Sequence, residues 1–312
     1  MERYYTFSEY CQKTFGRKLY RAALDAGMTC PNRDGKLGNK GCIFCDEGGS
    51  GDFAVSYHGQ KLTREDLIYN HQDGKNGDYI AYFQSYTNTY APVDRLRKLF
   101  TAALEDELFA GISIATRPDC LDKDVLALLA ELKKSYPKKF IWCELGLQTI
   151  HEKTAAWIRR GYPLPVFDEA VKSLHALDIP VIVHCILGLP QEDEQMVFQT
   201  MEHLNQLKIE GIKLQLLHYL SGTDLGRTYQ AEPDAYHVLS LDEYARMTAR
   251  CLGHLDPSIV IHRLTGDGNQ EILLAPSWST DKKKVLNLIR HVMKEENIVQ
   301  GSLREELKDE SR

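Results

Sequence analysis

Three cysteines near the start of the chain have the residue type and spacing of metal ligands. Cys42 and Cys45 form a Cys-x-x-Cys pair, and eleven residues separate that pair from Cys30 in a glycine-rich segment. Three thiolates can hold an iron–sulfur cluster while one iron stays open to another ligand. With His58 as a fourth ligand, the same thiols would form a Cys3His zinc site. A redox Cys-x-x-Cys is a third, weaker interpretation, because this pair lies in a loop instead of opening a helix. The spacing alone leaves these alternatives open.

The remainder of the chain predicts the fold that must position these ligands. Short β-branched or aromatic runs alternate with longer amphipathic stretches, which is typical of repeated βα units around a parallel sheet. The predicted strands are one near 22–27 and then 79–83, 111–115, 140–147, 180–187, 211–217 and 260–264. The predicted helices are 94–106, 122–135, 164–177, 192–207, 241–255 and 281–294. In such a barrel the functional residues follow the carboxyl ends of the strands.

Composition limits the class of protein. The chain has 312 residues, 43% of them hydrophobic, and no apolar run of about 20 residues that would cross a bilayer. We therefore expect a cytoplasmic protein with no membrane contact. The 8 cysteines are scattered, which favours reduced thiols or metal ligands over a disulfide framework. No linker divides the series, so we expect a core barrel with an N-terminal extension over 1–280, then a C-terminal helix and polar tail over 281–312.

The motifs that follow the predicted strands resemble those of one family. Phe44 directly precedes the third cysteine, and Gly188-Leu-Pro closes the strand at 180–187. Arg117 stands in Ile-Ala-Thr-Arg-Pro-Asp, and Glu144 opens Glu-Leu-Gly-Leu-Gln-Thr, which ends with Gln148 and Thr149. In this order the motifs resemble the radical S-adenosylmethionine (SAM) superfamily, specifically its YtqA/YhcC (MnmL-like) branch close to the catalytic subunit of Elongator.

This resemblance implies a fold and a set of site residues. The fold would be α/β, an incomplete (β/α)6 TIM-like barrel with N-terminal and C-terminal helical extensions. Cys30, Cys42 and Cys45 would hold a [4Fe–4S] cluster, and SAM would bind its open iron. The implied contacts to the cofactors are Phe44, Gln84, Ser85, Arg117, Glu144, Gln148, His184 and Gly188.

Several of these residues have alternative interpretations. Gln84 and Ser85 stand where most of the superfamily has a Gly-Gly-Glu-like turn, and a hydrogen-bonded loop is the other interpretation of this segment. Arg117 could instead form a structural salt bridge to Asp119 or Glu144. His184 could be a satisfied core histidine. Ile261–Gly268 resembles a closing segment of the same branch, with Arg263 as an anion contact at the rim. No residue is assignable as a catalytic acid or base.

The resemblance also implies an activity. A reduced cluster would split SAM to a 5′-deoxyadenosyl radical, with flavodoxin or ferredoxin as the electron donor. The implied substrate is the wobble uridine of tRNA, whose carboxymethylaminomethyl group would become aminomethyl before a tRNA methyltransferase acts. The alternatives are a radical SAM enzyme for a small metabolite and a zinc-stabilised binding protein. The basic, aromatic stretch between Tyr4 and Tyr20 would suit either an RNA-binding surface or an amphipathic helix packed on the barrel.

Overall fold

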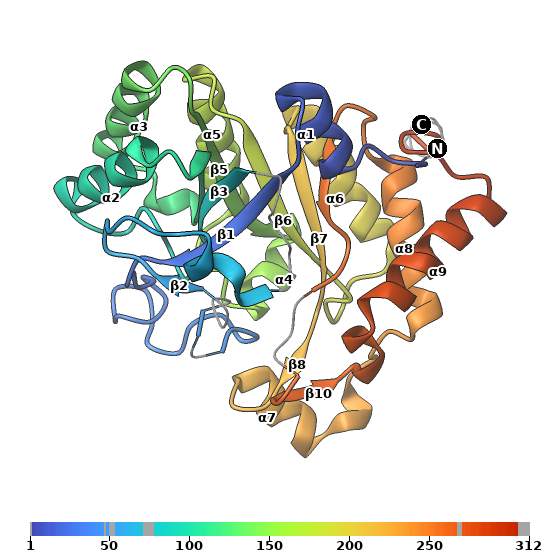
Figure 1. Cartoon of the computed structure of the whole chain (residues 1–312). Coiled ribbons are helices and arrows are strands. Elements are labelled where there is room, and N and C mark those ends of the chain that lie inside the picture. The colour runs from blue at the N-terminus through green and yellow to red at the C-terminus, as the bar shows by residue number, and fades with distance from the viewer. Residues whose placement is uncertain (1, 47, 50–53, 71–77, 267–269, 305–312) are drawn as a thin grey trace.

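The computed structural model describes residues 2–46, 48–49, 54–70, 78–266 and 270–304. Its main sheet contains eight parallel strands in the order β2-β1-β3-β4-β5-β6-β7-β9 and curls into an open barrel (Figure 1). The strands are β1 (Leu19–Asp25), β2 (Val55–Ser56), β3 (Asp78–Phe83), β4 (Phe109–Thr116), β5 (Phe140–Gln148), β6 (Val181–Leu187), β7 (Gly211–Leu216) and β9 (Val260–Arg263). The incomplete barrel predicted from the sequence is confirmed.

Amphipathic helices cover the outer face of this sheet (Figure 1). They are α2 (Val93–Glu105), α3 (Lys123–Ser135), α5 (Leu164–Ala176), α6 (Glu194–Leu207) and α8 (Leu241–His254). Helix α2 shows the principle: Leu96, Leu99 and Phe100 recur at helical spacing and are buried in the main core. The outward-facing side chains of each strand pack against these helices, which leaves the inward-facing side chains to line the barrel.

A short helix closes the amino-terminal end of the barrel. Helix α1 (Phe7–Phe15) begins after Thr6, whose hydroxyl accepts a hydrogen bond from the Glu9 N–H at 3.1 Å. Its rings pack into the barrel end, where the Phe7 and Phe15 centroids lie 6.3 and 6.5 Å from the ring of Trp142. Of the two interpretations of the aromatic amino-terminal stretch, the structure shows the packed amphipathic helix.

The opposite end, at the carboxyl ends of the strands, carries the loops. It includes α4 (Glu152–Trp157), α7 (Asp224–Ala231) and a two-stranded antiparallel sheet of β8 (Tyr219–Leu220) and β10 (Leu273–Ala275) (Figure 1). A separate apolar cluster at this end joins Ile43, between two of the cysteines, to Ile158, Ile186 and Tyr219. The cysteine loop is therefore packed against the barrel mouth.

The C-terminal helix belongs to the main core. Helix α9 (Lys282–Glu295) packs along α8 and buries Val285, Ile289 and Met293. Beyond it, the Gln300 N–H donates to the Arg3 carbonyl at 2.9 Å, so the first and last described segments lie side by side (Figure 1). The boundary at residue 280 stays a prediction, and the polar tail at 305–312 lies outside the described residues. None of the helices described is both long and apolar enough to cross a bilayer.

Candidate functional site

The loop after β1 is folded tightly around its cysteines. The N–H groups of Arg33 and Asp34 both donate to the Cys30 carbonyl, at 2.8 and 3.2 Å, and the Cys45 N–H donates to the Cys42 carbonyl at 3.0 Å. Gly41 has a φ of +73°, and a Cβ there would lie 2.9 Å from Arg33 Nε. A glycine at this position therefore permits both the left-handed backbone and the close approach of the Arg33 side chain.

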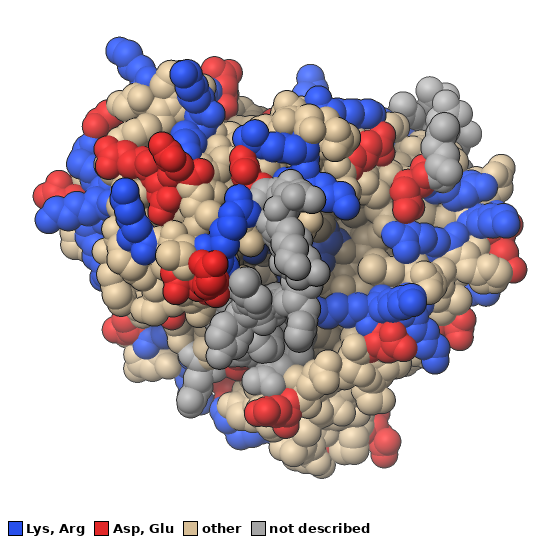
Figure 2. Space-filling view, in the orientation of Figure 1, with Lys and Arg blue, Asp and Glu red and all other residues tan. Residues whose placement is uncertain are grey.

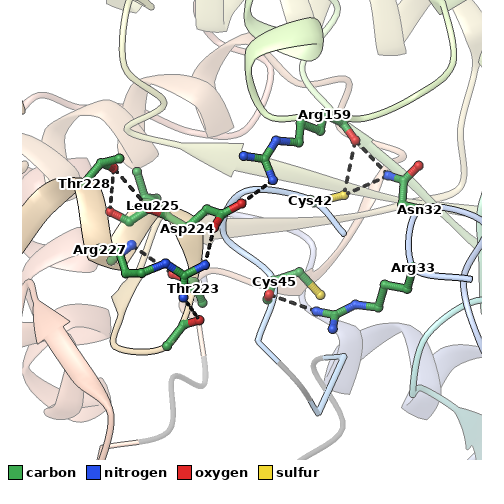
Figure 3. A network of polar contacts seen from close by, with 12 residues as sticks. Asn32, Arg33, Cys42, Cys45, Arg159, Thr223, Asp224, Leu225, Arg227 and Thr228 are labelled. Atoms are coloured by element: carbon green, nitrogen blue, oxygen red, sulfur yellow. Dashed lines mark hydrogen bonds and ion pairs between the residues drawn. The ribbon is translucent and has the colours of Figure 1, made fainter. Parts of the chain in front are cut away.

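Side chains from distant elements hold this loop in place (Figure 3). The Asn32 amide donates to the Arg159 carbonyl at 2.7 Å and contacts Cys42 Sγ at 3.5 Å. Arg159, in the turn after α4, pairs with Asp224 at 2.5 Å at the start of α7. Arg33 donates to the carbonyl of Cys45 at 2.9 Å. The loop is thus tied to two other loops of the barrel mouth.

The three thiols suit an iron–sulfur cluster. All are free and line one cavity of about 1230 Å³. Burial raises the pKa of the Cys45 thiol to about 12 and also raises that of Cys42, so a bound cation is needed to stabilise the thiolates. In a cluster each thiolate binds its own iron, so the sulfurs need not converge on one point.

A single zinc ion has a different requirement. Its ligands converge on one point at about 2.0–2.3 Å. Within the described part of the chain, no three His, Cys, Asp or Glu side chains are gathered in that way. His58 is exposed, lies 3.1 Å from the Ser56 hydroxyl and is not among the residues that line the cavity. The donor set therefore fits a cluster better than a Cys3His ion site.

The turn after β3 is held by a buried asparagine. The Asn88 amide donates to the carbonyls of Phe83, Ser85 and Ala115, at 3.0, 3.1 and 3.0 Å. Gln84 lines the cavity, whereas Ser85 is buried away from it. The hydrogen-bonded loop considered from the sequence is present, and the contact of Ser85 with a cofactor stays a prediction.

Other predicted contacts are divided between the cavity and its surroundings. Arg117 lines the cavity, but its guanidinium forms two hydrogen bonds to Asp119, at 2.9 and 2.8 Å, which is the structural salt bridge considered above. Phe44 and Gln148 also line the cavity. Gly188 does not, and a Cβ at its φ of +81° would lie 3.0 Å from Leu239 Cδ1. The positive φ of the turn and the close packing against Leu239 explain why residue 188 is a glycine.

A layer of polar side chains crosses the barrel interior, and we call it the inner polar layer. Its members come from β1, β3, β5, β6, β7 and β9 and are Arg21, Tyr82, Glu144, His184, Lys213, His262 and Arg263. Strand register sets three of them side by side, because His184 pairs with Lys213 and Lys213 with Arg263. Glu144 lies at the centre. It accepts hydrogen bonds from Ser113 and His184, both at 2.7 Å, and pairs with Lys213.

Mutual electrostatics fix the protonation of this layer. Burial alone would raise the pKa of Glu144, but Lys213, His184 and Arg21 outweigh it and hold that pKa well below its usual range. Burial lowers the pKa of Lys213 to about 7 and that of His184 to about 4. His184 is therefore neutral near pH 7, and its Nε2–H donates to the ionised Glu144. His184 also lines the cavity, so it is a satisfied histidine that a ligand can still reach.

Sequence reasoning missed Arg21 and Lys213. The signal was present, since each is a charged residue within a predominantly apolar strand, as Glu144 is. Arg263 was predicted as an anion contact, and it lines the cavity. The neighbouring Asp267 and Gly268, quoted with it, lie outside the described residues.

Comparisons with known proteins identify the family of this chain. The family model of the radical SAM superfamily matches residues 35–204, and that of the Radical_SAM C-terminal domain matches 209–295. YtqA of Bacillus subtilis is 41% identical over 99% of this chain and 95% of its own length. YhcC of Escherichia coli is 32% identical over 93% and 92% of the two chains. The solved structure of Elp3 from Methanocaldococcus infernus is 13% identical and superposes with a TM-score of 0.66, covering 92% of this chain and 65% of Elp3.

Proposed function

Because the chain belongs to the radical SAM superfamily, whose members use a [4Fe–4S] cluster and SAM, we propose that this enzyme modifies the wobble uridine of tRNA. In this proposal Cys30, Cys42 and Cys45 hold the cluster. When bound, cluster and SAM together supply a 5′-deoxyadenosyl radical that takes a hydrogen atom from the substrate. The protein positions the reactants and excludes water.

The chain's own residues divide this task between them. Asn32 and Arg33 fix the cysteine loop, and the positive charge of Arg33 stabilises the thiolates. Gln84, Arg117 and Gln148 line the cavity at the carboxyl ends of their strands, where SAM would contact the protein. Phe44 lies beside the third cysteine. Glu144 and His184 lie deeper, and Ser85 and Gly188 would act through the backbone turns that they form.

The size and charge of the cavity carry the proposal of an RNA substrate. Its 1230 Å³ exceeds the range of about 300–1,000 Å³ typical of a site for one small ligand, so SAM leaves room for a second group. Its described charged lining has three acidic residues, Asp46, Glu144 and Glu271, and six basic ones, Lys18, Arg21, Arg33, Arg117, Arg263 and Lys282. In Figure 2, Lys and Arg side chains lie beside the hollow of this face, with Asp and Glu side chains among them. Such an opening suits a flipped nucleotide and its phosphates.

The specific reaction is inferred from the resemblance to the Elongator branch. The substrate would be 5-carboxymethylaminomethyluridine and the product 5-aminomethyluridine, which a tRNA methyltransferase would then methylate. Flavodoxin or ferredoxin would supply the electron. The similarity to YtqA over nearly the whole chain and the Elp3-like fold support this placement.

A nucleoside profile of tRNA tests the proposal. Cells lacking the gene should accumulate 5-carboxymethylaminomethyluridine, as measured by mass spectrometry. Wild-type protein should restore the profile, and Cys42→Ala should not. Cys120→Ala is the matched control, because this free cysteine does not line the cavity. An unchanged wobble uridine would refute the RNA proposal, and SAM cleavage that needs no RNA would favour a small metabolite.

A further inference from the structure

We propose that the inner polar layer is an anion-binding site in which Arg21 binds a carboxylate or phosphate of the substrate. The inference deepens the proposed function and rests on it for the identity of that substrate. For 5-carboxymethylaminomethyluridine, the bound group would be the carboxylate at the tip of the side chain. The anion site itself is argued only from the residues below.

Arg21 is positioned to receive a ligand. Its Nη2 lies 2.6 Å from Nδ1 of His262, and its guanidinium lies 4.3 Å above the Phe7 ring centroid. Burial and Arg21 hold the pKa of His262 well below its usual range, so the ring is neutral and accepts this bond. Among the residues that the structure describes, the buried Nε–H of Arg21 has no hydrogen-bond partner. An anion beside it would supply the missing acceptor and complete the forked geometry that arginine offers to a carboxylate or phosphate.

The charges of the layer also favour an anion. Lys213 pairs with the carboxylate of Glu144, and the charge of Arg21 also stabilises that carboxylate. The two positive charges of Arg21 and Lys213 exceed the single negative charge of Glu144. His184 and His262 are neutral and add no negative charge. Unbalanced charge in a barrel interior is unfavourable, and an anionic ligand would reduce that cost.

The layer faces the cysteine side of the cavity that it lines. Arg21, Tyr82, Glu144 and His184 line the same cavity as the three cysteines, whereas Lys213 lies behind them with 1% of its surface exposed. Arg21 is the third residue of β1, and the strand runs from it towards the cysteine loop. Helix α1 closes the amino-terminal end (Figure 1). A substrate that enters from the mouth would therefore reach Arg21 with its leading tip.

Binding of matched nucleosides to the SAM-bound holoenzyme tests the proposal. The probes are 5-carboxymethylaminomethyluridine, its methyl ester, uridine and uridine 5′-monophosphate, and the readout is the dissociation constant from calorimetry. Wild type should bind the carboxylate about 10- to 100-fold more tightly than the ester, as expected for one charge-assisted hydrogen-bonded contact. Arg21→Gln should lose most of that preference, and Arg21→Lys should keep part of it. Arg97→Gln, an exposed arginine on α2, is the matched control.

Each outcome decides a different point. Tighter binding of the monophosphate than of uridine, lost in Arg21→Gln, would identify the anion as a phosphate. Two results would overturn the proposal. In one, wild type binds every charged probe and its neutral partner equally. In the other, the Arg21→Gln variant keeps the wild-type preference. Should thermal unfolding show that Arg21→Gln does not fold, Arg263→Gln is compared in the same way. An Arg21-dependent preference together with an unchanged tRNA profile would refute the assigned substrate and leave the anion site standing.

Discussion

Replacing Glu144 with glutamine should destabilise the protein strongly, because it leaves a buried lysine without its counter-charge. The side chains of Glu144 and Lys213 are 0% and 2% exposed, so water cannot replace the lost carboxylate. Removing one partner of a buried ion pair costs about 3–5 kcal/mol, and the nearby charges of Arg21 and Arg263 place this pair towards the upper part of that range. Denaturant unfolding at pH 6, below the pKa of about 7 that Lys213 has in the intact pair, measures the effect.

The double variant Glu144→Gln/Lys213→Met separates the ion pair from general disturbance of the core. Removing both charges should recover part of the stability, since a methionine of similar length leaves no buried lysine without a counter-charge. Substituting the exposed pair partner Arg97 with glutamine should change stability by less than about 1 kcal/mol. A loss below about 1 kcal/mol in Glu144→Gln, or a double variant no more stable than that single one, would refute the reasoning.

Three further outcomes are expected. Cys42→Ala should lose most of its iron and the brown colour of the anaerobically purified protein, while Cys120→Ala keeps both. Iron analysis measures this, and full iron retention in Cys42→Ala would contradict the ligand assignment. Burial lowers the pKa of His184 and of His218 from 6.5 to about 4. Between pH 4 and 6.5 the unfolded chain therefore binds more protons than the folded chain, so the free energy of unfolding should fall as the pH drops from 6.5 to 4. His218→Gln should flatten that pH profile in thermal melts, and an unaltered slope would count against it. Asn88→Ala should cost about 1–3 kcal/mol in denaturant unfolding, because the buried carbonyls of Phe83 and Ser85 lose the side-chain amide as a donor, and a near-neutral effect would show that the turn is held otherwise.

The regular elements were predictable where local signals were strong. Asp122 was expected at a helix start, and its carboxylate accepts the Val125 N–H at 2.9 Å just before α3. The predicted helix at 192–207 begins instead at Glu194, because Asp193 caps it through the Met196 N–H. Strand β1 starts at Leu19, earlier than the predicted 22, because pairing with β3 from Asp78 onward extends it. That pairing joins distant segments, so local sequence carries no sign of it.

The candidate site was predictable at its cysteines and less so in its interior. The type and spacing of the three cysteines predict a metal site, and the structure places all three on one cavity. The partner of Glu144 was not predictable, because Lys213 lies 69 residues away and reaches the carboxylate only through the register of β5, β6 and β7. The place of Arg21 beside these residues was not predictable either, because it also depends on which strands are neighbours in the sheet. Charged residues inside apolar strands are therefore useful signals, but their pairing is a property of the assembled sheet.

The ion pair with Lys213 changes the role that we expect for the Glu144 carboxylate. The resemblance implied that its carboxylate contacts SAM, yet both oxygens are already engaged, one by Ser113 and the other by His184 and Lys213. A carboxylate with these partners is better suited to orient His184 towards the cavity and to hold Lys213 and Arg21 at the barrel interior. The SAM contact stays a prediction. In the proposed anion site Glu144 offsets only part of the positive charge, and this partial compensation lets the layer remain folded without a ligand and still attract one.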